Sequence, residues 1–180
     1  MILSLISSNF IQSSMRRSGL HTLLLVGVLL WCFLIVTPPL WLLLNPSSPE
    51  IADSFYRSFS VICHQYDSRS LHIEGHKLAV CGRCSAIYFG FLAGVFAVRF
   101  LSRPLISRGL AWWILAATPM VIDVALDSMG FSASTTATRL VTGGIFGVIA
   151  AFILTPHFIQ GCLEIIHPSA QGIAYGRKAR

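Results

Sequence analysis

Most of the side chains that could carry chemistry lie in one short stretch of the sequence. Residues 61–84, VICHQYDSRSLHIEGHKLAVCGRC, contain three of the five cysteines and three of the six histidines. The stretch carries Cys63 near its start and ends in a C-x-x-C motif, Cys81 to Cys84. Three thiolates and one imidazole are a common ligand set for tetrahedral zinc. The spacing therefore predicts a metal site, with zinc as the expected ion.

The fourth ligand stays open when only local geometry is considered. His64 adjoins Cys63, and the side chains of adjacent residues point in different directions in most backbones. By this criterion His72 and His76 are better placed than His64 to complete the site.

Two other kinds of chemistry could use the same cysteines. An oxidising compartment would favour a disulfide between two of them, with the third thiol left over. A membrane thiol-disulfide oxidoreductase would use the C-x-x-C pair with Cys63 as the resolving thiol, although the βαβ surroundings of a thioredoxin-like fold are missing from the sequence. A non-enzymatic scaffold or assembly subunit with a stapled loop is the third class. Whether the protein is an enzyme therefore stays open.

A second group of polar residues lies within the later apolar segments. Asp123 and Asp127 are four residues apart, so they share one face of a helix. Carboxylates at such depth are costly and are normally paired or functional. Arg139, at the start of the next apolar segment, is the expected partner of one of them. The other carboxylate would be suited to proton transfer or substrate binding, so these three residues are the candidate catalytic group.

The elements that must position these residues are predicted by hydrophobicity. The chain is 54% hydrophobic and only 11% charged, whereas soluble domains carry about 25% charged residues. Each of four apolar segments is close to the length that crosses a bilayer: residues 20–44, 84–101, 110–128 and 138–156. We therefore expect an all-α integral membrane bundle of about four transmembrane helices, capped by a Cys/His-rich loop.

The chain is expected to form a single membrane domain, residues 1–180, with cytoplasmic tails at 1–17 and 168–180. Glycines four residues apart, at 90 and 94 and at 143 and 147, predict helices that approach closely. A further apolar stripe predicts a short helix on the bilayer surface; its members are Ile51, Phe55, Phe59 and Ile62.

The distribution of basic residues predicts the orientation. With the N-terminus inside, eight Lys and Arg residues fall on the cytoplasmic side and five on the outer side, as the positive-inside rule favours. Both termini are then cytoplasmic in the cell (inner) membrane, and the cysteine loop is periplasmic or extracellular. The net charge of +6 fits a lipid bilayer as partner, and no basic, aromatic-interleaved patch suggests nucleic acid. Homo-oligomer formation and the substrate stay open.

The signature residues resemble a prokaryotic family of small predicted membrane proteins known as a domain of unknown function. The resemblance covers residues 60–160 and rests on Cys-His-Gln, Cys-x-Arg-Cys and a later Arg-x-x-Thr-Gly. The matching positions are Cys63, His64, Gln65, Arg69, Ser70, Gly75, Cys81, Arg83, Cys84, Ser85, Tyr88, Gly90, Asp123, Arg139, Thr142 and Gly143. Ala86 departs from the family's usual glycine, and Asp127 stands where an amide is expected. The resemblance implies a multispan protein and favours His64 over His72 and His76 as the fourth ligand.

Overall fold

The computed structural model of the protein describes residues 2–100, 110–129 and 135–166, with side chains of the first helix from Ser18 onward. Its elements, in chain order, are α1 (Ile2–Leu44), α2 (Glu50–Ser60), the 3-10 turn η1 (Asp67–Arg69), β1 (Ser70–Ile73), β2 (His76–Cys81), α3 (Gly82–Val98), α4 (Leu110–Ser128) and α5 (Thr136–Ile166).

Three of the described helices are long and apolar enough to cross a membrane: Ser18–Leu44 within α1, Ala111–Ser128 within α4, and all of α5. Helix α3 is apolar but shorter, with 17 residues. The prediction of a largely helical membrane protein is confirmed. Three of the four predicted spans meet the length criterion among the described residues, and the segment 84–101 does not.

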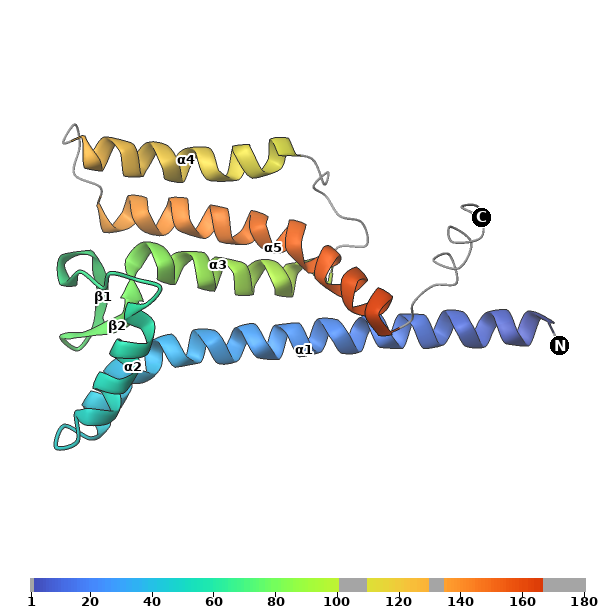
Figure 1. Ribbon diagram of the computed structural model, residues 1–180, viewed down its shortest axis with the longest axis horizontal. Coiled ribbons are helices and arrows are strands. Elements are labelled where there is room, and N and C mark those ends of the chain that lie inside the picture. The colour runs from blue at the N-terminus through green and yellow to red at the C-terminus, as the bar shows by residue number, and fades with distance from the viewer. Residues whose placement is uncertain (1, 101–109, 130–134, 167–180) are drawn as a thin grey trace, which may run out of the picture.

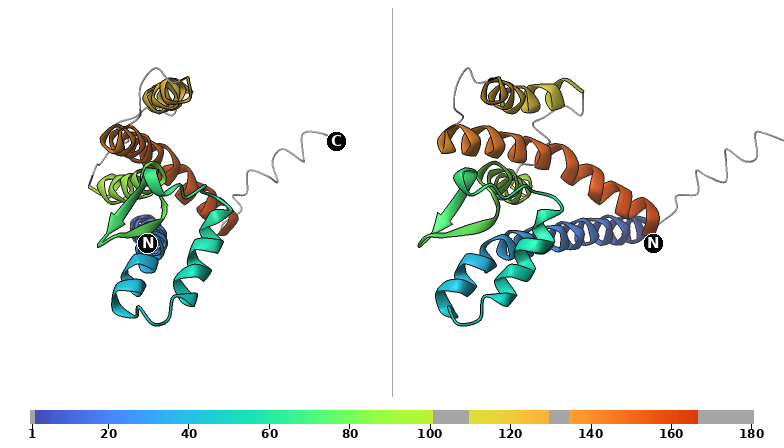
Figure 2. Two further views of the ribbon diagram at one scale, coloured as in Figure 1. Left: turned by 90° about the vertical axis from the view of Figure 1, so that its left-hand side faces the viewer. Right: turned by 60° about the vertical axis from the view of Figure 1, so that its left-hand side comes forward.

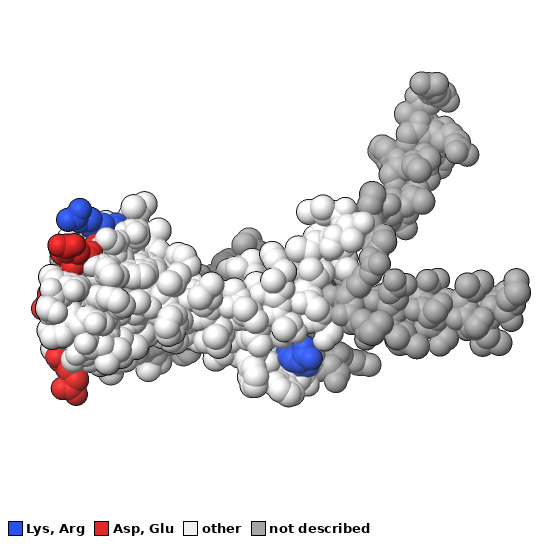
Figure 3. Space-filling model, turned by 90° about the horizontal axis from the view of Figure 1, so that it is seen from below, with Lys and Arg blue, Asp and Glu red and all other residues white. Residues whose placement is uncertain are grey.

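The helices lie side by side in the order α4, α5, α3, α1 (Figure 1). Helix α2 and the two strands gather at one end of this layer, where α1 ends and α3 begins, and α1 starts at the opposite end (Figure 1). Helix α2 turns back beside the last part of α1 (Figure 2). On the face seen in Figure 3, acidic and basic side chains concentrate at the end with the strands, and the middle is almost uncharged apart from one basic patch.

The prediction of an all-α fold is wrong at one place, because residues 70–81 form a β-hairpin. The strands β1 and β2 pair antiparallel, with Ser70 opposite Cys81 and Ile73 opposite His76. The turn uses Glu74 and Gly75, whose φ angles are 48° and 83°; two positive φ values match the turn type that joins tight hairpins. The alternation of polar and apolar residues from Ser70 to Ile73, followed by Glu-Gly, was the available signal. The hairpin leads the chain to the start of α3 and places Cys81 directly before it.

Helix α2 forms as predicted, but the centre of its apolar stripe faces the protein rather than the bilayer. Phe59 is only 5% exposed and packs in a cluster with Ile35 of α1 and Leu78 of β2, and Phe55 packs against that cluster. Ile51 is exposed. Burying an aromatic side chain in this way contributes about 2 kcal/mol. This contact holds α2 on the end of α1.

Helices α3 and α5 touch through the predicted glycines. A Cβ atom at Gly143 would lie 2.7 Å from the carbonyl oxygen of Arg83, and one at Gly94 would lie 2.6 Å from Cβ of Ala151. Such distances leave no room for a side chain, so the two backbones are in direct contact. The first turn of α3, which follows Cys81, is thereby fixed against the start of α5.

Candidate metal centre

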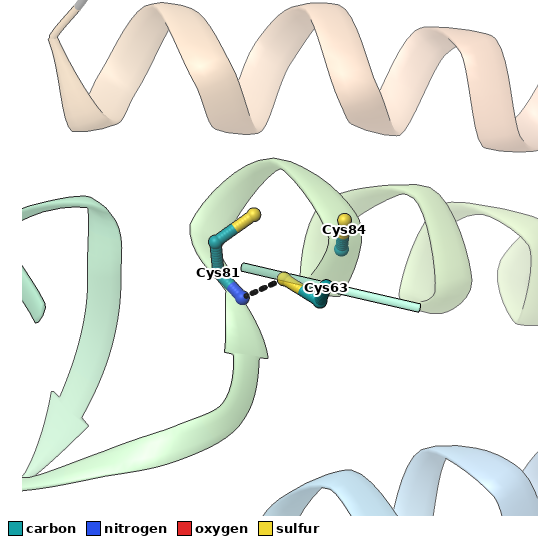
Figure 4. A group of neighbouring side chains, drawn as sticks. All are labelled: Cys63, Cys81 and Cys84. Carbon is teal, nitrogen blue, oxygen red and sulfur yellow. Dashed lines mark hydrogen bonds between the residues drawn. The ribbon is translucent and has the colours of Figure 1, made fainter. Parts of the chain in front are cut away.

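Three cysteines converge at the end of the helical layer (Figure 4). The sulfur atoms of Cys63, Cys81 and Cys84 all lie within 4.8 Å of one another, and all three thiols are free. A tetrahedral zinc ion with Zn–S bonds of about 2.3 Å would place its sulfur ligands roughly 3.8 Å apart. The cluster can therefore hold a metal ion after small side-chain adjustments.

Each sulfur comes from a different structural segment. Cys63 follows α2, and its N–H donates to the carbonyl of Phe59 at 3.0 Å. Cys81 ends β2, and Cys84 lies in the first turn of α3. The backbone N–H of Cys81 donates to Sγ of Cys63 at 3.2 Å (Figure 4). This hydrogen bond holds two of the three ligand-bearing segments together.

The cysteines rest on the apolar cluster that fixes α2. Cys63 is 5% exposed and belongs to this cluster, and Cys81 and Cys84 pack against it. Ionised thiolates are costly in such surroundings unless a cation balances them. A metal ion would supply the balancing charge. Without a bound cation, the apolar cluster is compatible with ionisation of at most one of the three thiols.

The hydrogen bonds among the three cysteines favour ionisation of one of them, Cys81. A hydrogen bond from the Cys84 thiol lowers the pKa of Cys81 to about 5, while burial acts in the opposite direction. The backbone N–H groups at the start of α3 and the Cys63 thiol add to the lowering. Cys81 occupies the N-cap position of α3, where the helix dipole favours negative charge. Cys81 is thus a thiolate at neutral pH before any metal binds.

A layer of ion pairs lies beside the C-x-x-C turn. Arg83, between the two cysteines of the motif, pairs with Asp123 of α4. Asp127 of α4 forms ion pairs with Arg139 of α5, at an N···O distance of 3.6 Å, and with Arg69 of η1, at 3.4 Å. The prediction that Arg139 pairs with one carboxylate is therefore confirmed for Asp127. The other carboxylate, Asp123, is paired with Arg83 of the cysteine motif, a partner that the sequence did not single out.

These ion pairs are largely shielded from solvent. The side chains of Arg83, Asp123, Asp127 and Arg139 are 10–18% exposed, whereas Arg69 is 48% exposed. Three guanidinium groups against two carboxylates leave one excess positive charge in the layer. The layer ties η1, α3, α4 and α5 together next to the three thiols.

The histidines lie apart from the sulfur cluster. The ring of His64 is exposed and stacks on Tyr66, with 5.8 Å between centroids. His72 pairs with Asp67 at 3.1 Å, and His76 begins β2. Among the described residues, the group of potential ligands contains the three cysteines and no imidazole. A role for His64, or for His76 in its place, as fourth ligand stays a prediction.

Gln65 has a structural role that its residue type alone does not suggest. It has a positive φ of 51°, which is uncommon for a residue other than glycine. Its side-chain Nε2 donates to the carbonyl of Tyr56 at 2.7 Å, and its own carbonyl accepts from Nζ of Lys77 at 3.2 Å. Gln65 thus turns the chain two residues after Cys63 and joins the loop to α2 and β2. Only its place in the Cys-His-Gln motif singled it out.

Comparisons with known proteins agree with the membrane assignment. The family model described as "Predicted membrane protein (DUF2085)" matches residues 63–153. The matched segment begins at Cys63 and contains the C-x-x-C turn, both aspartates and Arg139. The description names no activity.

Two archaeal relatives share much of the chain. The "Uncharacterized protein MJ1492" of Methanocaldococcus jannaschii is 32% identical over 145 residues, which is 78% of this chain and 93% of the relative. An "Uncharacterized protein" of Methanothermobacter thermautotrophicus is 28% identical over 85 residues, 47% of this chain and 77% of the relative. No solved structure matches the chain.

Proposed function

Since the chain belongs to the DUF2085 family of predicted membrane proteins, we propose that its function rests on a zinc centre at the membrane boundary. The observation that carries the proposal is the convergence of Cys63, Cys81 and Cys84 from three segments to within 4.8 Å. Free cysteines packed as small hydrophobic residues would not need a loop, a hairpin and a helix start to meet at one point.

The donor set supports zinc in particular. Soft thiolate ligands in a tetrahedral arrangement favour zinc over hard cations such as magnesium or calcium. A divalent ion with three thiolates carries one net negative charge. The neighbouring ion-pair layer, which contains Arg69, Arg83 and Arg139, carries one excess positive charge. The two charges offset each other across a short distance, because Arg83 lies within the ligand-bearing turn.

The fourth coordination position decides what such a centre could do. Structural zinc sites have four protein ligands, whereas catalytic sites have three and leave a position for water or substrate. His64 is exposed and stacked on Tyr66, which supports an open position and a site that exchanges ligands. The group of Asp123, Asp127 and Arg139 would then support the turn through ion pairs. Rotation of His64 onto the metal would close the site and make it structural.

Metal analysis of the purified protein tests the proposal. We expect about one zinc ion per chain and no disulfide. Three single variants, Cys63→Ser, Cys81→Ser and Cys84→Ser, should each bind much less zinc, because three thiolates are the minimum set of ligands. Cys162→Ser is the matched control, since Cys162 lies in α5 outside the cluster. Metal-free protein with a reducible disulfide would exclude the zinc centre. His64→Ala should leave the zinc content unchanged if the fourth position is open.

A thiol-disulfide oxidoreductase is the second candidate, and one observation favours it. The lowered pKa of Cys81 makes it a nucleophile at neutral pH, and two further thiols lie within 4.8 Å of it. Such proximity suits attack on a partner disulfide followed by resolution. Retention of all three thiols after treatment with oxidised glutathione, together with bound zinc, would exclude this candidate.

We further propose that the cysteine loop faces the periplasm or cell exterior. The distribution of Lys and Arg supports this orientation. An introduced thiol at Ser68, which is exposed in η1, should react in intact cells with a maleimide that cannot cross membranes. Labelling only after permeabilisation would place the loop in the cytoplasm.

A further inference from the structure

An apolar groove with a volume of about 670 Å³ lies among α1, α3, α4 and α5. It is open along one side, and no charged residue lines it. Aromatic side chains dominate its wall: Trp31, Tyr88, Phe91, Trp113, Phe146 and Phe158. Volumes of this size are typical of small-molecule sites, so the groove is large enough for a hydrocarbon chain.

The groove has the length of one bilayer leaflet. Its wall along α5 runs from Phe146 to Phe158, and twelve residues of helix span about 18 Å. Half of the hydrocarbon core of a bilayer measures about 15 Å. Three of the helices that line the groove contain the candidate membrane spans. The medium around the groove is therefore hydrocarbon rather than water.

The lining differs from a helix–helix interface of this same protein. Helices in membranes associate through small residues, and α3 meets α5 in this way, with Gly143 against Arg83 and Gly94 against Ala151. The groove instead presents large aromatic and aliphatic side chains, with Gly27 and Ala150 as its small members. A flexible acyl or isoprenoid chain can fit between such side chains, whereas a second helix cannot approach closely.

The groove adjoins the cysteine cluster through Tyr88. This residue lines the groove and also packs against the apolar cluster that contains Cys63. Cys81 and Cys84 pack against the same cluster. Trp31 packs edge-on against Tyr88 at 5.8 Å and against Phe59 at 5.4 Å. One end of the groove is therefore formed by residues that also surround the thiols.

We propose that the groove binds the hydrocarbon chain of a membrane lipid, with the lipid's polar end at Tyr88, beside the cysteine centre. This inference rests on the proposed metal centre and names its substrate class: an amphipathic lipid that enters from the bilayer. The groove aligns the chain along α5, so the polar end reaches the position that the three thiols leave open.

Tryptophan quenching by a brominated lipid tests the proposal, because adjacent residues provide a matched pair. Trp113 lines the groove and Trp112 does not, although both lie at nearly the same depth in α4. Variants that retain only one of the two tryptophans, with the others changed to Phe, would be placed in nanodiscs and titrated with phosphatidylcholine carrying dibrominated chains. Trp113 should be quenched saturably at about one lipid per protein, as a single site requires.

A filled groove supplies the second variant. A Cβ atom at Gly27 would meet no atom within 4 Å, and the same holds for Gly19 on the same helix outside the groove. In Gly27→Leu the added side chain therefore starts from a Cβ position that is clear of other atoms, and it fills part of the groove. It should weaken saturable quenching of Trp113 about tenfold, the scale of overpacking a site by a few carbons. Gly19→Leu should leave the quenching unchanged.

The outcomes separate this inference from the metal centre. Parallel quenching of both tryptophans in proportion to bulk lipid, or quenching unaffected by Gly27→Leu, would overturn the groove proposal while zinc content stays normal. A dimer that dissociates on Gly27→Leu would also overturn it, because a second copy would then occupy the groove. Absence of zinc with saturable quenching intact would instead refute the substrate assignment together with the proposed function.

Discussion

Helices α3 and α4 both lie against α5, but they are attached by different forces. Helix α3 contacts α5 through glycines, with backbone atoms touching along its length. Helix α4 is connected to α5 at one end by the ion pair of Asp127 with Arg139, and further along by Trp113, whose ring lies 6.5 Å from that of Phe146. Asp123 of α4 pairs with Arg83 of α3. Close packing does not depend on pH or salt, whereas ion pairs at a polar boundary do.

Both attachments meet at the same turn. The carbonyl of Arg83 packs on Gly143 of α5, while its guanidinium pairs with Asp123 of α4. The residue between two of the thiols is therefore held by its backbone through packing and by its side chain through charge. The position of the C-x-x-C turn therefore depends on its packing against α5, whereas its electrostatic surroundings depend on α4.

The largest effect is expected when the close packing between α3 and α5 is disturbed. Gly143→Leu would place a side chain where a Cβ atom is already 2.7 Å from the Arg83 carbonyl. Overpacking of this kind costs about 3 kcal/mol, so we expect a lower melting temperature and loss of bound metal. Gly144→Leu is the control, because a Cβ atom there meets nothing within 4 Å. Similar melting temperatures for the two variants would show that α3 is not held by this contact.

A smaller effect is expected on the charge side. Asp123→Asn removes the carboxylate that pairs with Arg83, and both side chains are less than 20% exposed. Partners that orient metal-binding residues typically change metal affinity 10- to 100-fold, and we expect about tenfold weaker zinc binding here with the helical fold retained. Competition with a chelator and circular dichroism measure the two quantities. Asp123→Glu should restore most of the affinity; an unchanged affinity in Asp123→Asn would remove α4 from the metal centre.

An effect of similar size is expected for the ionisation of Cys81 at the start of α3. In metal-free protein the pKa of Cys81 is lowered to about 5 by the Cys84 thiol. Its rate of alkylation should therefore rise with an inflection near pH 5 and level off above it, whereas in Cys84→Ala the inflection should move to higher pH. At pH 6 the expected difference is about tenfold, because the gain in thiolate exceeds the loss of nucleophilicity.

The same pKa shift has a sign for stability. The unfolded thiol, with an ordinary pKa near 9.0, binds a proton in a pH range where the folded thiol does not. Metal-free protein should therefore lose stability as the pH falls from about 9 toward 5.

Mass spectrometry of the alkylated peptide measures the rate at which Cys81 is alkylated at each pH. Identical pH profiles for the native protein and Cys84→Ala would show that the Cys84 hydrogen bond does not set the charge of Cys81.

The main architecture could be predicted from local patterns. Long apolar runs identify α1, α4 and α5 as candidate spans. A chain in lipid must satisfy its own backbone hydrogen bonds, so a long apolar run predicts a helix. Glycines at a spacing of four indicate a close helix contact because they have no side chain to hold the backbones apart. The hairpin was missed because its strands are short, and its turn at Glu74 and Gly75 gives only a weak signal between stronger helical ones.

The composition of the candidate site was also predictable, but its pairings were not. Cysteine types and the C-x-x-C spacing singled out Cys63, Cys81 and Cys84. The choice of Arg83 as the partner of Asp123 could not be read from the sequence, because the two residues are 40 positions apart and several arginines were available. The exposed position of His64 depends on the backbone after Cys63, where Gln65 takes a positive φ.

By itself, the sequence determined which segments are apolar enough to be candidate membrane spans and which side chains could bind a metal, since hydrophobicity and donor chemistry are properties of single residues and their spacing. Only the tertiary structure decided that Cys63 meets Cys81 across 18 positions, that Arg83 lies between α4 and α5, and that Tyr88 joins a groove to the thiols. These contacts arise from how the hairpin closes the chain and how glycines let α3 reach α5. Chain closure and packing depend on all segments together.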